Sequence, residues 1–346
     1  MLGGGVFVTQ NKTLPGSYIN FVSTLNTNST LGERGVVAIA LQIGKAVGTV
    51  IEVTKADFVS NCESLFGVEY GDDKVAPLRE IFCNANKVYV YDVEGEIGTA
   101  TEVINAFEPY EFNVLCAYTD SDDDVTAYIN GVKTWRDEMG KKCQLVVYNT
   151  TNVDHEGVIN VVSTVSNEGA DPYALTAWVA GAEAGCKVNE SCTNKLYNGE
   201  YTIVTDKTQK QLEDCIKNGQ IAFHLVYGDI RLLEDINTLT TVTVDKGEDF
   251  KSNQTIRVVD QIANDIAKLF NTKYLGRIPN NASGRVSLWA DIVAHHRELE
   301  KIAAIETFDS GSLTVEQGAN KKSVVVNDVI TVVNSMAQLY MTVVVQ

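Results

Sequence analysis

The middle of the chain alternates short apolar runs with amphipathic stretches. The apolar, β-rich runs predict strands over 35–41, 49–53, 88–93, 112–118, 144–148, 158–162, 201–205 and 221–227. Apolar residues at helical spacing predict helices between them, over 55–66, 77–85, 99–107, 122–139, 173–184 and 208–217. Such alternation is typical of an α/β layer with a largely parallel sheet. We therefore predict a small mixed α/β domain over 31–86 and a larger α/β domain over 87–245.

Beyond the Thr-rich run 238–244, which predicts one more strand, the pattern changes character. An apolar stripe predicts a helix, and its members are Ile256, Val259, Ala263, Ile266 and Phe270. A turn-rich link over 274–285 precedes a second helix that runs to about Ala304 and buries Leu288, Ile292 and Leu299. Valine-rich residues over 321–334 then predict strands. Two helices followed by strands predict a small α+β domain over 246–337.

Both ends of the chain have the composition of strands that lack a neighbour. Residues 338–346 are uncharged and rich in valine, and the β-prone runs 5–9 and 15–22 precede a polar stretch at 23–30. Chain ends usually bury too little to offset the entropy of ordering them, and an unpaired strand edge recruits another chain. We therefore predict arms over 1–30 and 338–346, with joints at 23–30 and 334–337, and a protein that polymerises.

Charge is distributed unevenly between the two parts of the chain. The net charge is −17; residues 250–346 carry +1, and residues 1–249 carry −18. An acidic chain argues against nucleic acid or an anionic membrane as partner, and we find neither an apolar stretch long enough for a bilayer nor an export signal. The asymmetry suggests that the acidic part faces water and the balanced part faces protein. An acidic surface that serves only solubility remains the alternative.

The residues that most often carry chemistry do not form a recognisable site. Seven scattered cysteines without a CxxC pair predict reduced thiols, with no disulfide framework and no zinc site. No strand is followed by GxGxxG or a P-loop, so we predict no nucleotide cofactor. His155 could act as a general base, but no nucleophile motif accompanies it. We predict no catalytic, cofactor or metal site, although an active site built from scattered residues stays open.

Two further candidates have ordinary structural explanations. His295 and His296 are adjacent, so on a helix they point about 100° apart and cannot chelate one ion from one face. We expect one of them half-buried and the other facing solvent. The acidic run 120–124 lacks the glycine and distal glutamate of a calcium loop and is expected to begin a helix, where carboxylates complement the helix dipole.

Several separate motifs resemble one family in that family's order. Residues 257–266 (RVVDQIANDI), 278–285 (IPNNASGR) and 339–345 (LYMTVVV) resemble contractile tail sheath proteins of Firmicutes myophages and related R-type bacteriocins. Residues 15–21 (PGSYINF) and 32–39 (GERGVVAI) resemble the opening segments of that family. The resemblance implies that the 87–245 domain is subtilisin-like but not a protease, which agrees with the missing nucleophile motif.

The same resemblance implies a structural role in a polymer. It implies hexameric rings stacked around an inner tail tube, with baseplate and tail terminator proteins as further partners. The C-terminal domain would face the tube, and the arms would add strands to sheets of neighbouring subunits. Contraction would repack rigid domains without ATP. The protein would be made in the cytoplasm of a bacterial host and assembled into a virion tail or a bacteriocin particle.

The resemblance and the charge pattern select candidate contact residues. The N-terminal arm candidates are Tyr18, Ile19, Asn20, Phe21 and Val22. The C-terminal arm candidates are Leu339, Tyr340, Met341, Thr342, Val343, Val344 and Val345. Basic candidates for tube contact are Arg257, Lys268, Lys273 and Arg277, with ordinary surface charge as the alternative. Rival hypotheses are a homo-oligomeric α/β enzyme and a static surface-array protein; the missing export signal disfavours the latter.

Overall fold

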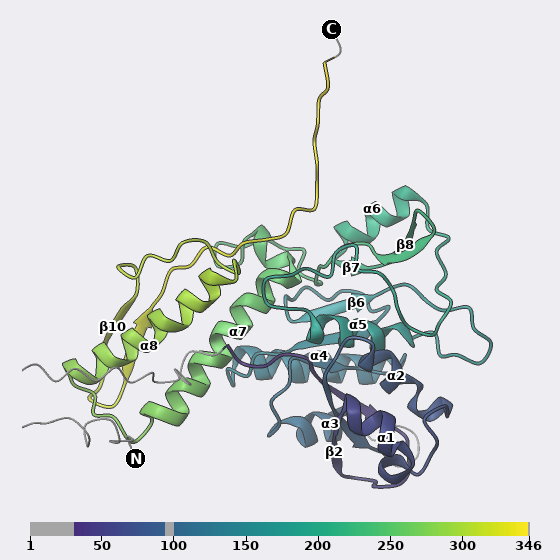
Figure 1. Ribbon diagram of the computed structural model, residues 1–346, viewed down its shortest axis with the longest axis horizontal. Coiled ribbons are helices and arrows are strands. Elements are labelled where there is room, and N and C mark those ends of the chain that lie inside the picture. The colour runs from purple at the N-terminus through teal and green to yellow at the C-terminus, as the bar shows by residue number, and fades with distance from the viewer. Residues whose placement is uncertain (1–30, 94–99, 345–346) are drawn as a thin grey trace, which may run out of the picture.

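A seven-stranded sheet forms the centre of the molecule in the computed structural model, which describes residues 31–93 and 100–344 (Figure 1). The strand order is β2-β3-β1-β4-β5-β6-β7, and all neighbours are parallel except β2 and β3. The strands are β1 (Val36–Leu41), β2 (Val50–Thr54), β3 (Lys87–Asp92), β4 (Val114–Cys116), β5 (Gln144–Tyr148), β6 (Val158–Val161) and β7 (Gln220–Ile221). The predicted α/β fold with a mainly parallel sheet is confirmed.

Both faces of this sheet are buried, which explains the continuous apolar character of its strands. In β1, Val37 and Ile39 join one apolar core while Ala38 and Ala40 join the other. The first core is covered by α1 (Lys55–Phe66), α2 (Ala76–Phe82), α5 (Leu175–Gly185) and α6 (Gln209–Lys217). The second core is covered by α3 (Ala100–Phe107) and α4 (Asp122–Asp137). The predicted helix at the acidic run is present, because Ser121 caps α4 and three aspartates fill its first turn.

The C-terminal part is a second layered unit with its own core. It contains α7 (Asn253–Leu269), a π-helical turn (Phe270–Tyr274), α8 (Ala282–Lys301), β10 (Thr314–Gln317) and β11 (Val324–Asn327). Leu288, Ile292 and Leu299 of α8 are buried in this core, as predicted. Helix α7 lies between the α/β layer and α8 (Figure 1). It is therefore the element that joins the two parts.

Two of the predicted strands are wrong. Residues 201–205 contribute only an isolated bridge between Ile203 and Val165. The run 238–244 forms a loop in which the amides of Thr240 and Thr241 donate to Asp154 Oδ1. β-Branched residues favour a strand only where a neighbouring strand can pair with it, and within the described residues these runs have none. The same region contains a separate hairpin, β8 (Phe223–Val226) with β9 (Asp229–Leu232), and short 3-10 turns lie at 73–75 and 248–251.

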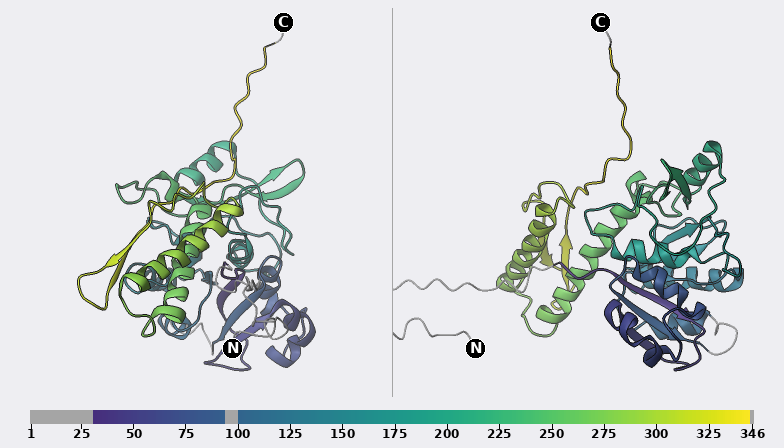
Figure 2. Two further views of the ribbon diagram at one scale, coloured as in Figure 1. Left: turned by 60° about the vertical axis from the view of Figure 1, so that its left-hand side comes forward. Right: turned by 45° about the vertical axis from the view of Figure 1, so that its right-hand side comes forward.

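The chain leaves the folded body near residue 335 and continues outward (Figures 1 and 2). The predicted N-terminal arm, with candidates Tyr18–Val22, lies outside the described residues, as does Val345. Of the valine-rich run 321–334 only β11 forms a strand, followed by a bridge from Val332 to Ile305. Among the described helices, none has the length and apolar composition to cross a membrane.

Candidate assembly surfaces

The first half of α7 is polar in sequence and buried in the structure. Its buried polar members are Asn253, Gln254, Thr255, Arg257, Asp260 and Gln261. Each of them is hydrogen-bonded to a segment outside α7, and Asn253, Arg257 and Asp260 bond to the α/β layer; Asn253, for example, donates to the carbonyl of Ile236 and accepts from Gln144 Nε2. Buried polar groups require such partners, and the partners fix orientation as apolar contacts do not. This half of α7 therefore holds the C-terminal unit in one orientation on the α/β layer.

Arg257 is the centre of this contact, and its predicted role as a surface residue is wrong. Its side chain is fully buried, and Nη2 lies 2.6 Å from Glu183 Oε2 and 3.2 Å from Asp235 Oδ2. Its Nη1 donates to the carbonyl of Glu190 at 2.6 Å. A guanidinium has five N–H donors in a fixed plane, so one arginine can hydrogen-bond to two carboxylates in a site that water does not reach. The sequence stripe placed Arg257 on a helix correctly, but it did not reveal the two acidic partners.

The two carboxyls beside Arg257 differ in their proton affinity. Burial, followed by the charge of Asp235, raises the pKa of Glu183 well above its ordinary value. Burial also acts to raise the pKa of Asp235, but the Arg257 guanidinium and the hydrogen bonds that the carboxylate accepts, one of them from the Cys192 amide, together leave that pKa below its ordinary value. Glu183 Oε1 and Asp235 Oδ1 are buried without another partner. The site therefore favours the charged form of Asp235 and disfavours the charged form of Glu183.

A second buried ion pair connects the same two parts of the molecule. Arg136 of α4 donates to Asp260 of α7 through both terminal nitrogens, at 2.6 and 2.9 Å. Both side chains are less than one-tenth exposed. Bidentate pairs of this kind are geometrically specific, so the C-terminal unit cannot rotate on the α/β layer without breaking them.

The other basic candidates lie at the opposite end of α7. Lys268 and Arg277 are exposed, and Lys273 is half-buried with Nζ 2.5 Å from Asp291 Oδ2. The Arg277 side chain donates to the carbonyl of Thr272. The three residues thus lie on the last turn of α7 and the link that follows it. Their contact with a tube remains a prediction.

The C-terminal arm is apolar and exposed. Gln254 holds its root, because Gln254 Nε2 donates to the Val333 carbonyl and the Ser335 amide donates to Gln254 Oε1. Asn334 and Ser335, which were expected to belong to a flexible joint, are therefore bonded to α7. From Met336 onward the apolar side chains are exposed, including Leu339 at 85% and Tyr340 at 88%. Residues 338–344 form no strand within this chain (Figure 2).

A short hairpin in the same unit has free edges. Strands β10 and β11 are antiparallel, with Val315 opposite Val326, and in the described residues they form a sheet of two strands only. Their outer backbone groups therefore have no partner from a third strand in that part of the chain. Val325 and Val326 are exposed at 46% and 39%. An edge of this kind accepts an incoming strand.

The adjacent histidines do not lie as expected. His295 and His296 are both buried, which corrects the prediction that one of them faces solvent. His295 Nε2 lies 3.0 Å from Asp265 Oδ2, and His296 Nε2 lies 2.7 Å from Asp328 Oδ2. The two rings meet through their Nδ1 atoms, 3.3 Å apart. Carboxylates on either side allow both rings to be buried, which the sequence alone did not reveal.

The remaining polar groupings have partners that account for them. His155 Nδ1 accepts from the Gly157 amide at 2.9 Å, so Nε2 carries the ring proton and faces Asp137 Oδ2 at 3.3 Å. Neighbouring Glu156 is held by Lys246 Nζ at 2.8 Å. Burial lowers the pKa of His155.

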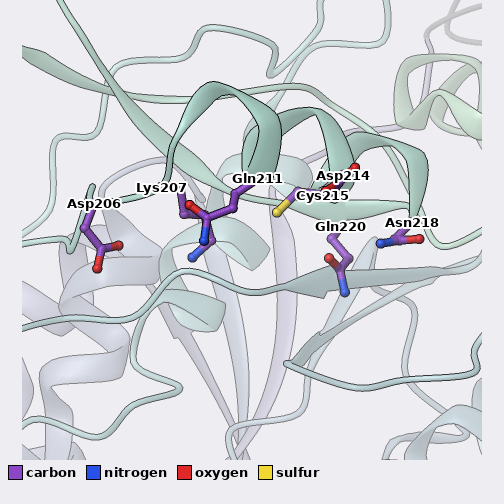
Figure 3. Close-up of a pocket in the computed structure, with 7 residues that line it drawn as sticks. All are labelled: Asp206, Lys207, Gln211, Asp214, Cys215, Asn218 and Gln220. Atoms are coloured by element: carbon purple, nitrogen blue, oxygen red, sulfur yellow. The ribbon is translucent and has the colours of Figure 1, made fainter.

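A hollow of about 410 Å³ lies beside α6 and is lined by polar side chains (Figure 3). These include Asp206, Lys207, Gln211, Asp214 and Gln220.

The cysteines are mostly buried. All seven are free thiols, and six of them are buried. Burial raises the pKa of Cys143 to about 11 and that of Cys116 to about 12, which disfavours the reactive thiolate. Cys116 and Cys143 are therefore core residues of the fold.

Two family models match this chain. Residues 95–238 match the phage tail sheath protein central domain, and residues 245–346 match the phage tail sheath C-terminal domain. The tail sheath protein of Clostridium phage phiCD119 is 29% identical over 230 residues, which cover 66% of this chain and 63% of that protein. The chain spans between 37% and 63% of the length of the curated relatives it matches.

Solved structures share the whole architecture. The sheath tail protein of Desulfitobacterium hafniense superposes with a TM-score of 0.77 at 23% identity, covering 92% of this chain and all of that one. The helical sheath of the anti-feeding prophage in its contracted state gives a TM-score of 0.68 at 15% identity, covering 96% of this chain and 99% of that one. At these identities the likeness establishes the fold.

Proposed function

We propose that this chain, which belongs to the phage tail sheath family, is a structural subunit of a contractile tail sheath. It would polymerise as stacked hexameric rings around an inner tail tube and contract to drive the tube through a cell envelope. The observation that carries the proposal is the combination of an exposed apolar arm from Met336 onward with a two-stranded sheet whose edges are free. Among the described residues of one chain neither has a partner strand, and a second copy would supply one to both.

Strand addition is the physical basis of the proposed links. In an added strand, alternate side chains face the same side, so Leu339, Met341 and Val343 would share one face. Each new backbone hydrogen bond contributes about 0.5 to 1.5 kcal/mol net, and buried apolar area adds about 25 cal/mol per Å². Several such bonds on each arm give a link that holds while the subunit bodies move. Residues Tyr18–Val22 would serve in the same way at the other end.

Contraction would then be a rigid-body event. The buried pairs Arg257–Glu183 and Arg136–Asp260 favour a body that moves as one unit, and the chain from Met336 onward supplies the flexible connection. The driving force would be surface newly buried between subunits in a more compact lattice, so no nucleotide site is required. Lys268, Lys273 and Arg277 are the proposed tube contacts. Baseplate and tail terminator proteins would bound the polymer in a virion tail or a bacteriocin particle.

Electron microscopy of the purified, concentrated protein tests the proposal. The full chain should form rings or tubes, and a variant lacking Leu339–Gln346 should remain monomeric. The point variant Met341→Lys should also lose assembly, because a charge in an added strand cannot be buried between sheets. Met341→Leu, which keeps an apolar side chain of similar size, is the matched control and should assemble. Small discrete particles from the full chain at every concentration would favour the homo-oligomeric enzyme instead.

A further inference from the structure

A continuous row of hydrogen-bonded groups crosses the C-terminal unit. At one end the Gly32 amide donates to both carboxylate oxygens of Asp265, at 3.2 Å each. The row continues from Asp265 Oδ2 to His295 Nε2 at 3.0 Å and from His295 Nδ1 to His296 Nδ1 at 3.3 Å. It ends at Asp328 Oδ2, 2.7 Å from His296 Nε2. Four side chains therefore connect two segments that lie 296 positions apart in the sequence.

The two connected segments are those to which the proposed function assigns intersubunit contacts. Gly32 lies two residues after the predicted N-terminal arm, and Asp328 directly follows β11, the second strand of the free-edged hairpin. Asp265 belongs to α7 and both histidines to α8. The row thus joins the segment that leads out of the subunit to the sheet that would receive a neighbour.

The row needs one proton more than its groups ordinarily carry. Three consecutive hydrogen bonds between four side chains require three protons, whichever atoms hold them. Two neutral imidazoles flanked by two carboxylates supply only two, which leaves two nitrogen lone pairs facing each other at the Nδ1 contact. With a fourth proton on the rings, both Nδ1 atoms carry a hydrogen, so two donors face each other at this contact. The continuous row therefore exists only with a single proton between the rings.

The surroundings hold these groups in place. The His296 side chain is completely buried and packs on the Phe308 ring, with centroids 4.7 Å apart. Gln261 Nε2 donates to Asp265, and the guanidinium carbon of Arg297 lies 5.9 Å from the centroid of the Phe308 ring. A Cβ at Gly32 would lie 2.4 Å from Asp265 Oδ1, so a side chain at this position would displace the carboxylate. The charged and titratable groups around the rings are thus Asp265, Asp328 and, beyond Phe308, Arg297.

We propose that the row Asp265–His295–His296–Asp328 is a proton-dependent relay that couples the β10–β11 hairpin to the root of the N-terminal arm. A strand added to the hairpin would change the hydrogen bond between Asp328 and His296. Through the two histidine rings and Asp265, it would then change the hydrogen bonds of the Gly32 amide. In a sheath the relay would pass a rearrangement from one intersubunit link to the next. This consequence rests on the proposed function, whereas the relay itself is a property of the single chain.

Hydrogen exchange on the full chain, kept dilute and monomeric, tests the coupling. His296→Leu removes the contact with Asp328 and does not touch Gly32, yet amides at 32–34 should exchange about five-fold faster or more. Gly32→Ala should in turn accelerate exchange at 326–329. His155→Leu, which removes another buried histidine bonded to a carboxylate, and Gly71→Ala, where a Cβ meets nothing within 4 Å, should change neither region.

Acceleration confined to the immediate neighbours of each substitution would overturn the coupling. If His296→Leu fails to fold, the Gly32→Ala variant still decides the question from the other end. The shared proton has its own readout, because the chain has only four histidines and selective ¹⁵N labelling resolves their ring nitrogens. A proton between the two Nδ1 atoms supports the relay, and two unprotonated Nδ1 atoms overturn it. None of these measurements requires polymerisation, so failure of the sheath proposal would leave their outcome intact.

Discussion

The first half of α7 and the C-terminal arm both depart from the usual burial of apolar residues and exposure of polar ones, because α7 buries polar residues and the arm exposes apolar ones. In α7, polar residues such as Gln254, Arg257 and Asp260 are buried, and each is bonded to another element. In the arm, Leu339, Tyr340 and their apolar neighbours are exposed. Buried polar groups and exposed apolar runs are the informative exceptions to ordinary burial. The first specifies one orientation inside the subunit, and the second requires a partner outside it.

Removing the central cation of α7 should have the largest effect on folding. Arg257→Met leaves the Asp235 carboxylate buried without a counter-charge, so the free energy of unfolding should fall by about 3 to 5 kcal/mol. Denaturant unfolding of the monomer measures this loss. Arg297→Met is the control, because its pair with Glu300 is partly exposed and should contribute less than about 1 kcal/mol. A loss of similar size in both variants would show that burial of the Arg257 site confers no special stability.

Replacing Glu183 should have a smaller effect that depends on pH. Burial raises the pKa of Glu183 above its value in the unfolded chain, so between those two values the unfolded chain releases a proton that the folded chain keeps. Wild-type stability therefore loses a contribution as pH rises through this range. Glu183→Gln has no such proton, so its stability relative to wild type should increase with rising pH.

Denaturant unfolding at several pH values from about 5 to about 8 checks this sign. The matched variant Asp235→Asn should show no such trend over this range, because the pKa of Asp235 lies below its ordinary value and the carboxylate is charged in both the folded and the unfolded chain. A difference between Glu183→Gln and wild type that is constant over the whole range would contradict a raised pKa for Glu183.

Much of the fold was predictable because it depends on local pattern, whereas the contacts between distant segments were not. The β1 and β3 runs and the α7 stripe carry clear periods, and the structure has these elements. The runs 201–205 and 238–244 have the composition of strands but no neighbouring strand, and composition does not report pairing. Arg257 and the two histidines were misplaced for a related reason, since their partners Glu183, Asp235 and Asp328 are remote in sequence.

Of the two candidate assembly surfaces, the C-terminal arm was easier to predict from the sequence than the β10–β11 hairpin. The arm was evident because residues 338–346 are uncharged and apolar at a chain end. The hairpin that would accept it was half predicted, because β11 lies in the run 321–334 for which strands were predicted, whereas the four-residue β10 was not predicted. A strand of that length gives a weak periodic signal, and its free edge is a property of the sheet rather than of the segment.

The junction between α7 and the arm should show the smallest effect. Gln254→Ala removes two hydrogen bonds to the chain at Val333 and Ser335, so stability should fall by about 1 kcal/mol and the Ser335 amide should exchange faster. Hydrogen exchange and denaturant unfolding measure both, with Gln209→Ala, an exposed glutamine of α6, as control. Unchanged exchange at Ser335 would mean that other contacts, such as the Val333 amide to the Ala304 carbonyl, define where the arm begins. Faster exchange of the Ser335 amide in a variant that still assembles would place the junction at Gln254. It would also show that the Gln254 contact orients the root of the arm but is not needed for the arm to bind a neighbouring subunit.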